Sequence, residues 1–155
     1  MLTEVGRFAP KDFPKDPVLI RTDAILTGSY VVADDATVGG RFAANGDIHV
    51  DKASHLTLWL DLALGSLTSI DIKIVYLDNN KDANEYQELS IATSAGSSTL
   101  SPHVLTIPST VADGKYLVTL PTPASEWVRI YAIGTGTATS SSLEIKANFM
   151  PPGSE

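Results

Sequence analysis

The sequence predicts an all-β protein: an antiparallel, jelly-roll-like β-sandwich or barrel with an extended N-terminal arm. Apolar and polar residues alternate with a period of two through most of the chain after residue 18, which is typical of half-buried strands. Turn residues recur between these segments at the even spacing of antiparallel sandwiches and barrels. No segment shows a 3.6-residue period over three turns, so no long helix is expected. An immunoglobulin-like sandwich, without the Cys–Trp–Cys core, is the main alternative topology.

The alternation is strictest between residues 56 and 77. Every second residue from Leu56 to Leu64 is leucine, and Ile70, Ile72 and Ile74 alternate with polar residues further on. Each half is predicted to be a strand with one buried face. Because only Gly65-Ser66 and a short polar link separate the halves, they are predicted to pair as an antiparallel hairpin. A second sheet is then needed to cover both apolar rows.

The first twenty residues differ from the rest of the chain. Pro10, Pro14 and Pro17 disfavour both a helix and a central strand. Four spaced apolar residues are predicted to anchor this extended arm, either on its own domain or on a neighbour: Leu2, Val5, Phe8 and Phe13. The predicted organisation is therefore an arm over 1–20, a sandwich over 21–150 and a flexible tail over 151–155.

Other strands follow from alternating segments between turn signals. A strand over 24–32 is expected to break at Gly28, and Asn45-Gly46-Asp47 predicts a tight turn between strands 41–43 and 48–50. Residues 134–142, rich in Gly, Thr and Ser, are predicted to form a flexible loop. The remaining predicted strands span 86–93, 103–107, 115–120, 126–133 and 143–149.

Composition narrows the classes of partner. The chain has 155 residues, a size typical of one domain, and a net charge of −7 with a pI of about 4.8. Its eleven Lys and Arg residues are scattered, which argues against direct nucleic-acid binding and against an anionic membrane surface. The absence of cysteine excludes disulfides, zinc–thiolate sites and iron–sulfur clusters. The first residues lack the apolar core of a signal peptide, and no apolar run reaches the length of a membrane span.

The sequence contains no pattern typical of catalysis. His49, His55 and His103 are expected to be ordinary surface histidines, since no serine lies in a Gly-x-Ser-x-Gly elbow. Asp61 and Asp71 lie on the outward faces of the two central strands, where they could approach each other as a glycosidase pair does. An outward Asp is more often solvated or paired with a cation. We therefore expect neither an enzyme nor a cofactor.

One loop contains alternating oxygen ligands. Asp78, Asn80 and Asp82 are candidate ligands for calcium, which binds such oxygens. The pattern departs from an EF-hand loop, because Ala83 replaces the glycine of position six and Leu89 the glutamate of position twelve. A plain hairpin loop is the alternative, since Asn and Asp favour turns on their own.

Aromatic side chains are the candidate partner-binding residues. Trp127, Arg129 and Tyr131 are predicted to form an exposed stripe on one strand, and Trp59 projects from the face opposite the leucine row. Aromatic residues and arginine are enriched at protein interfaces, and aromatics also line sugar-binding faces. Alternatively, these side chains fill a second core layer or lie under the N-terminal arm.

The end of the chain carries a resemblance. Residues 125–136 read Ser-Glu-Trp-Val-Arg-Ile-Tyr-Ala-Ile-Gly-Thr-Gly, and a Ser/Thr loop and Leu-Glu-Ile-Lys-Ala follow. This segment resembles the last hairpin of small tailed-phage virion proteins. The small acidic β domain, the lack of cysteine and the extended arm resemble the capsid decoration (auxiliary or cement) proteins of tailed bacteriophages.

The resemblance covers the last third of the chain by pattern and the rest by architecture. It implies a structural protein that is made in the host cytoplasm and binds the capsid exterior as a homotrimer. Its partners would be the major capsid protein and its own copies, and it would stabilise the capsid through intersubunit contacts. Two alternatives remain. One is a jelly-roll carbohydrate-binding module that stacks sugars on Trp59, Trp127 and Tyr131. The other is a different phage structural domain, from a tail or a head fibre.

Overall fold

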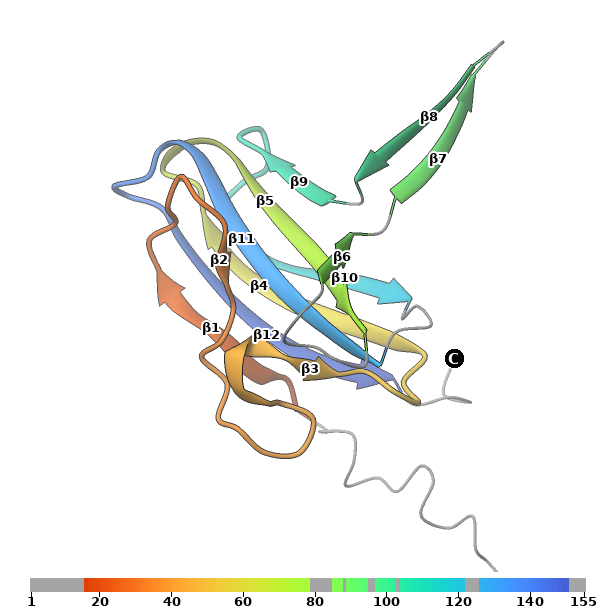
Figure 1. Cartoon of the computed structure of the whole chain (residues 1–155). Helices are drawn as coiled ribbons and strands as arrows, with labels where there is room; N and C mark the ends of the chain where they lie inside the picture. Colours follow the sequence, from red (N-terminus) through yellow and green to blue (C-terminus); the bar gives the residue numbers. More distant parts are fainter. Residues whose placement is uncertain are drawn as a thin grey trace, which may run out of the picture.

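Two antiparallel sheets pack face to face in a computed structural model of the chain (Figure 1). The structure describes residues 16–78, 85–87, 89–94, 97–102, 104–121 and 126–150. One sheet has the strand order β1-β12-β4-β10. The other has the order β2-β11-β5-β6, with β3 also paired to β11 and β9 to β5. The predicted all-β sandwich is therefore confirmed.

The strands keep the alternation from which they were predicted. Their bounds are β1 Val18–Ala24, β2 Val31–Val32, β3 Ile48–His49, β4 His55–Ala63, β5 Ser66–Leu77, β6 Glu85–Gln87, β7 Leu89–Ser94, β8 Ser97–Pro102, β9 Val104–Pro108, β10 Gly114–Pro121, β11 Trp127–Thr137 and β12 Ser142–Met150. A single 3₁₀ turn, η3, spans Ala44–Gly46 among the described residues. The same part of the chain contains no helix long and apolar enough to cross a membrane.

The core lies between the two sheets and is built from their inward rows. The leucines of β4 face the isoleucines of β5, while β11 and β12 add one row each. The most deeply buried members are Leu58, Ile70, Ile72, Ile130, Leu143 and Ile145. Full burial of one such side chain stabilises the fold by about 1.5–3 kcal/mol.

The two central strands do not pair with each other, so the predicted hairpin is wrong. β4 pairs with β12 and β10, whereas β5 pairs with β11, β6 and β9. The chain crosses from one sheet to the other between Leu64 and Leu67. A hairpin would place both apolar rows on the same face of one sheet. After the crossing, the two rows cover each other directly.

The crossing depends on a glycine. Gly65 has φ +58°, a conformation that side chains disfavour, and a Cβ at this position would lie 2.7 Å from the carbonyl carbon and oxygen of Ser140. The backbone N–H of Leu67 donates to the carbonyl of Leu64 at 2.9 Å and closes the turn. Only a residue without a side chain fits this position.

Replacing this glycine tests the crossing. Gly65→Ala should lower the free energy of unfolding by about 1–3 kcal/mol, because a left-handed backbone and a backbone clash must both be accommodated. Gly28→Ala is the matched control: a Cβ at Gly28 would meet no atom within 4 Å, and its φ lies outside the left-handed region. Urea unfolding followed by circular dichroism measures both variants. Equal stability of the two variants would contradict this account of the turn.

The last two strands are likewise in different sheets. β11 pairs with β2, β3 and β5, while β12 pairs with β1 and β4. The segment that carries the phage resemblance is therefore not a hairpin.

The loop predicted at 134–142 is also wrong, because β11 continues to Thr137 against the start of β5. A Cβ on Gly134 would lie 3.0 Å from the Leu67 methyl groups, and Gly136 has φ +107° at a register shift. These glycines allow close packing and a bulge.

Three other boundaries differ from the prediction. β1 begins at Val18, before the predicted domain boundary, and ends at Ala24, so the strand predicted over 24–32 is reduced to Val31–Val32. The strand predicted over 86–93 is divided into β6, which pairs with β5, and β7, which pairs with β8. The turn predicted around residue 46 is confirmed, since Phe42 bridges to Ile48 across η3, but the predicted strand over 41–43 is reduced to isolated bridges at Phe42.

One hairpin projects away from the sandwich. β7 and β8 pair with each other and, among the described residues, with no other strand (Figure 1). No described strand therefore pairs with either outer edge of this hairpin. The predicted arm anchors Leu2, Val5, Phe8 and Phe13 and the predicted tail over 151–155 lie outside the described residues.

Candidate functional site

The outer face of the four-stranded sheet contains a groove of about 540 Å³. It crosses β12, β4 and β10, and Asp16-Pro17, which immediately precede β1, form part of its wall. Its outward apolar side chains include Trp59 from β4 and Leu117 from β10. Such a concave surface with aromatic side chains is the common form of a binding site.

Strand register explains why these side chains meet. Lys146, Trp59 and Leu117 are direct cross-strand neighbours on β12, β4 and β10. The period-two alternation that turns Leu58 and Leu60 into the core turns this row outward. Trp59 is 40% exposed and Leu117 57% exposed, which is unusual for large apolar residues. The indole N–H of Trp59 donates to Oδ1 of Asn148 at 2.9 Å, which orients the ring.

Charged side chains surround this apolar floor. Lys115 donates a hydrogen bond to Asp61, and this contact raises the pKa of the lysine. Nζ of Lys146 lies 3.8 Å from Oε1 of Glu144. With Asp16, the groove is lined by three acids and two lysines. The arrangement suits a ligand with an apolar centre and polar or cationic flanks.

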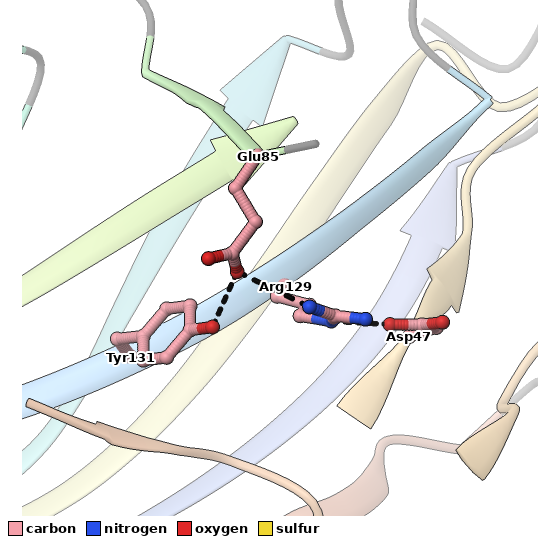
Figure 2. Close-up of polar contacts among 4 residues, drawn as sticks. All are labelled: Asp47, Glu85, Arg129 and Tyr131. Atoms are coloured by element: carbon pink, nitrogen blue, oxygen red, sulfur yellow. Dashed lines mark hydrogen bonds and ion pairs between the residues drawn. The ribbon is translucent and has the colours of Figure 1, made fainter. Parts of the chain in front are cut away.

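The outer face of the six-stranded sheet is closed by a polar network (Figure 2). Arg129 on β11 donates through Nε to Oδ1 of Asp47 and through Nη1 to Oε1 of Glu85, the latter at 3.2 Å. The hydroxyl of Tyr131 donates to the same oxygen of Glu85. Asp47 is 1% exposed. The network joins β11 to the turn before β3 and to β6.

Burial and hydrogen-bond partners both shift the pKa values of Arg129 and Tyr131 in this network. Burial lowers the pKa of Arg129, but the hydrogen bond and charge of Asp47 outweigh it and raise the pKa overall. Burial raises the pKa of Tyr131, and its hydrogen bond to Glu85 raises it further. At neutral pH, Arg129 therefore stays a charged guanidinium and Tyr131 stays a neutral phenol. We interpret the network as a structural clamp.

The predicted exposed stripe is wrong in its geometry. Arg129 and Tyr131 are half-buried in the clamp, and Trp127 is half-buried and stacks on His49 with ring centroids 4.6 Å apart. Trp59 lies on the opposite face of the sandwich, because β4 belongs to the other sheet. Alternation along one strand identified the outward residues. It contains no signal for Asp47, from the turn before β3, or for Glu85, from β6, which bond to residues of the stripe.

The predicted carboxylate pair is also separated. Asp61 faces outward from the four-stranded sheet and Asp71 from the six-stranded sheet, so the two lie on opposite faces of the sandwich. The reason is again the crossing at Gly65. His49 lies on β3 and stacks on Trp127, whereas Nδ1 of His55 on β4 lies 3.1 Å from Oγ of Ser54. His103 lies outside the described residues.

The calcium candidates lie at a gap in the description. Asp78 directly follows β5, and Asn80 and Asp82 are outside the described residues. Within the described ranges, no group of three or more His, Asp or Glu residues is placed to hold a metal ion. The calcium hypothesis stays a prediction.

Comparisons with known proteins give one structural neighbour. No family profile matches the chain, and no curated protein matches it. The crystal structure of the SPBc2 prophage-derived protein YomS is similar, with 17% sequence identity and a TM-score of 0.42. The match covers 88% of this chain and 93% of that one. At this TM-score the similarity defines neither a family nor a function.

Removing one partner of the clamp should lower the free energy of unfolding. Arg129→Met leaves the carboxylate of Asp47 buried without its counter-charge, so the free energy of unfolding should fall by about 3–5 kcal/mol. Lys115→Met is the matched control, since Lys115 is 81% exposed and water screens its ion pair with Asp61, so this change should leave the free energy of unfolding nearly unaltered. Urea unfolding compares the two. Adding Asp47→Asn to Arg129→Met should restore part of the loss, and a similar cost for both single variants would argue against the clamp.

The raised pKa of Tyr131 predicts a loss of stability at alkaline pH. The folded protein retains the phenolic proton to a higher pH than the unfolded chain does. The contribution of Tyr131 to the free energy of unfolding is therefore complete below about pH 10, the ordinary pKa of tyrosine. It is lost as the pH rises through the pKa of Tyr131 in the folded protein. Urea midpoints measured between pH 8 and 11 should fall, and the fall should be smaller in Tyr131→Phe. An identical pH dependence in both proteins would contradict the assignment.

Proposed function

We propose that this protein is a non-catalytic structural component of a phage virion that binds the capsid exterior and stabilises it through intersubunit contacts. The observation that carries the proposal is the projecting hairpin formed by β7 and β8 (Figure 1). An element that leaves the sandwich with both edges open is suited to a contact with another molecule.

The register of the hairpin supports a docking role. Leu89 pairs with Pro102 and Ile91 with Leu100, and polar or small residues pair at the positions between them. A two-stranded hairpin by itself is marginally stable in water, so a partner surface would stabilise it. Strand edges and alternating side chains are the features by which β-augmentation recognises a partner.

The chain as a whole also fits a capsid-binding role. It is small and acidic, it lacks cysteine, and its plan resembles that of capsid decoration proteins. Each contact would bury a modest apolar area, and each Å² buried contributes about 25 cal/mol of binding free energy before the cost of ordering is subtracted. A homotrimer that binds the major capsid protein where capsomers meet would repeat these contacts by symmetry, and repetition raises avidity without new chemistry.

Co-sedimentation with capsids tests the proposal. The probe is expanded capsids assembled from the major capsid protein that is encoded in the same genome. We expect saturable binding with a fixed number of bound copies at each capsomer junction. Bound protein should also raise the temperature at which the capsids are disrupted. Replacing residues 88–103 with a short Gly/Ser linker should abolish binding and leave the sandwich folded, because β7 and β8 pair with no other described strand. Gly28→Ala, where an added Cβ meets no atom within 4 Å, is the control for nonspecific loss.

Two outcomes would overturn the proposal. One is no binding to these capsids by the full chain. The other is unchanged binding by the protein without its hairpin. Labelling of intact particles with a specific antibody then separates a capsid position from a tail or head-fibre position.

A carbohydrate-binding module is the second candidate, because the groove exposes Trp59 near Asp61 and Glu144. Aromatic faces flanked by carboxylates are suited to sugars. The predicted platform of Trp59, Trp127 and Tyr131 is divided between two faces, so only Trp59 remains as the stacking residue. Quenching of Trp59 fluorescence by members of a glycan panel would favour this candidate.

A further inference from the structure

We propose that residues 1–15 of the same chain occupy the groove on the four-stranded sheet, with Phe13 seated against Trp59 and Leu117. The first observation is the place where the described chain begins. Asp16 and Pro17 form part of the groove wall, and β1 starts at the next residue. The segment that precedes them therefore starts at the groove itself.

The reach of this segment matches the width of the groove. Neighbouring strands lie about 4.8 Å apart, so β12 and β10 are separated by about 10 Å. An extended chain advances about 3.3–3.6 Å per residue, and Phe13 lies three residues before Asp16. Phe13 therefore reaches the middle of the groove, where Trp59 and Leu117 are exposed. Residues before Phe8 would extend past β10.

The sequence of the segment favours anchoring by side chains over strand pairing. Among the described strands, β10 is the last of its sheet, and none of them pairs with its outer edge. Pro10, Pro14 and Pro17 have no N–H to donate, so the segment is a poor partner for a continuous ladder along that edge. Proline also keeps the segment extended, which reduces the entropy lost when it docks. A phenyl ring on an exposed indole and a leucine then supplies apolar burial.

Charge is complementary as well. Three of the eleven cationic residues and two of the eighteen acidic residues lie within residues 1–15, which gives this segment a net charge of +1. The other eight cations and sixteen acids give residues 16–155 a net charge of −8. Lys11 and Lys15 flank Phe13, with Asp12 between them, and the groove lining has Asp16, Asp61 and Glu144 against Lys115 and Lys146, an excess of one acid. A cationic segment with a central aromatic ring is the kind of ligand that this groove suits.

Tryptophan fluorescence provides a direct test in the full chain. The sequence has two tryptophans, so Trp127→Phe leaves Trp59 as the single reporter. In this background, Phe13→Ser should raise the acrylamide quenching constant of Trp59 about two-fold, because the phenyl ring no longer covers the indole. Val5→Ser is the matched control within the segment and should leave the quenching constant unchanged.

Peptide addition completes the test. A synthetic peptide of residues 1–15, added to the Phe13→Ser protein, should restore the protection of Trp59, and the same peptide with Phe13→Ser should not. Equal quenching in the parent and the Phe13→Ser protein would overturn the proposal, as would restoration by the variant peptide. Protection that disappears on dilution of the parent protein would place the segment on a second copy and overturn the assignment to the same chain. These readouts do not involve capsids, so the inference stands or falls independently of the proposed function.

Discussion

The fold depends on the burial of two apolar rows that lie next to each other in the sequence and face each other across the core. Leucines of β4 and isoleucines of β5 belong to different sheets, and the turn at Gly65 carries the chain between them. Because the two rows cover each other, the sandwich needs no third layer. β12 and β10 pair on either side of β4, while β11 pairs with one edge of β5 and β6 and β9 pair with the other.

The same crossing determines the character of the two outer faces. Residues that alternate with the buried rows point outward, and the crossing sends those of β4 and β5 to opposite sides of the molecule. On the six-stranded side, Arg129 is held by Asp47 and Glu85, and the aromatic residues around it are half-buried. On the four-stranded side, Trp59 and Leu117 stay exposed in a groove. One face is therefore closed by its own side chains, while the other presents apolar surface.

Surfaces suited to contact lie apart from the buried clamp. The groove lies over β12, β4 and β10. The hairpin formed by β7 and β8 lies between β6 and β9 in the sequence, and these two strands belong to the other sheet (Figure 1). A rigid sandwich that holds a groove on one sheet and a projecting hairpin on the other can contact two surfaces at once. This separation lets each surface be altered without disturbing the core.

The sequence by itself determined the fold class and most of the strands, because a period of two is a local property that each strand displays alone. It also identified Trp59, Trp127, Arg129 and Tyr131 as outward residues. Only the tertiary structure decided which strands pair. The sequence of β4 and β5 has the pattern of a hairpin, and only the path of the turn between them places the two strands in different sheets. That choice separated Asp61 from Asp71 and Trp59 from Trp127. It also brought Asp47 and Glu85 to Arg129, because partners in space that are distant in sequence leave no periodic signal.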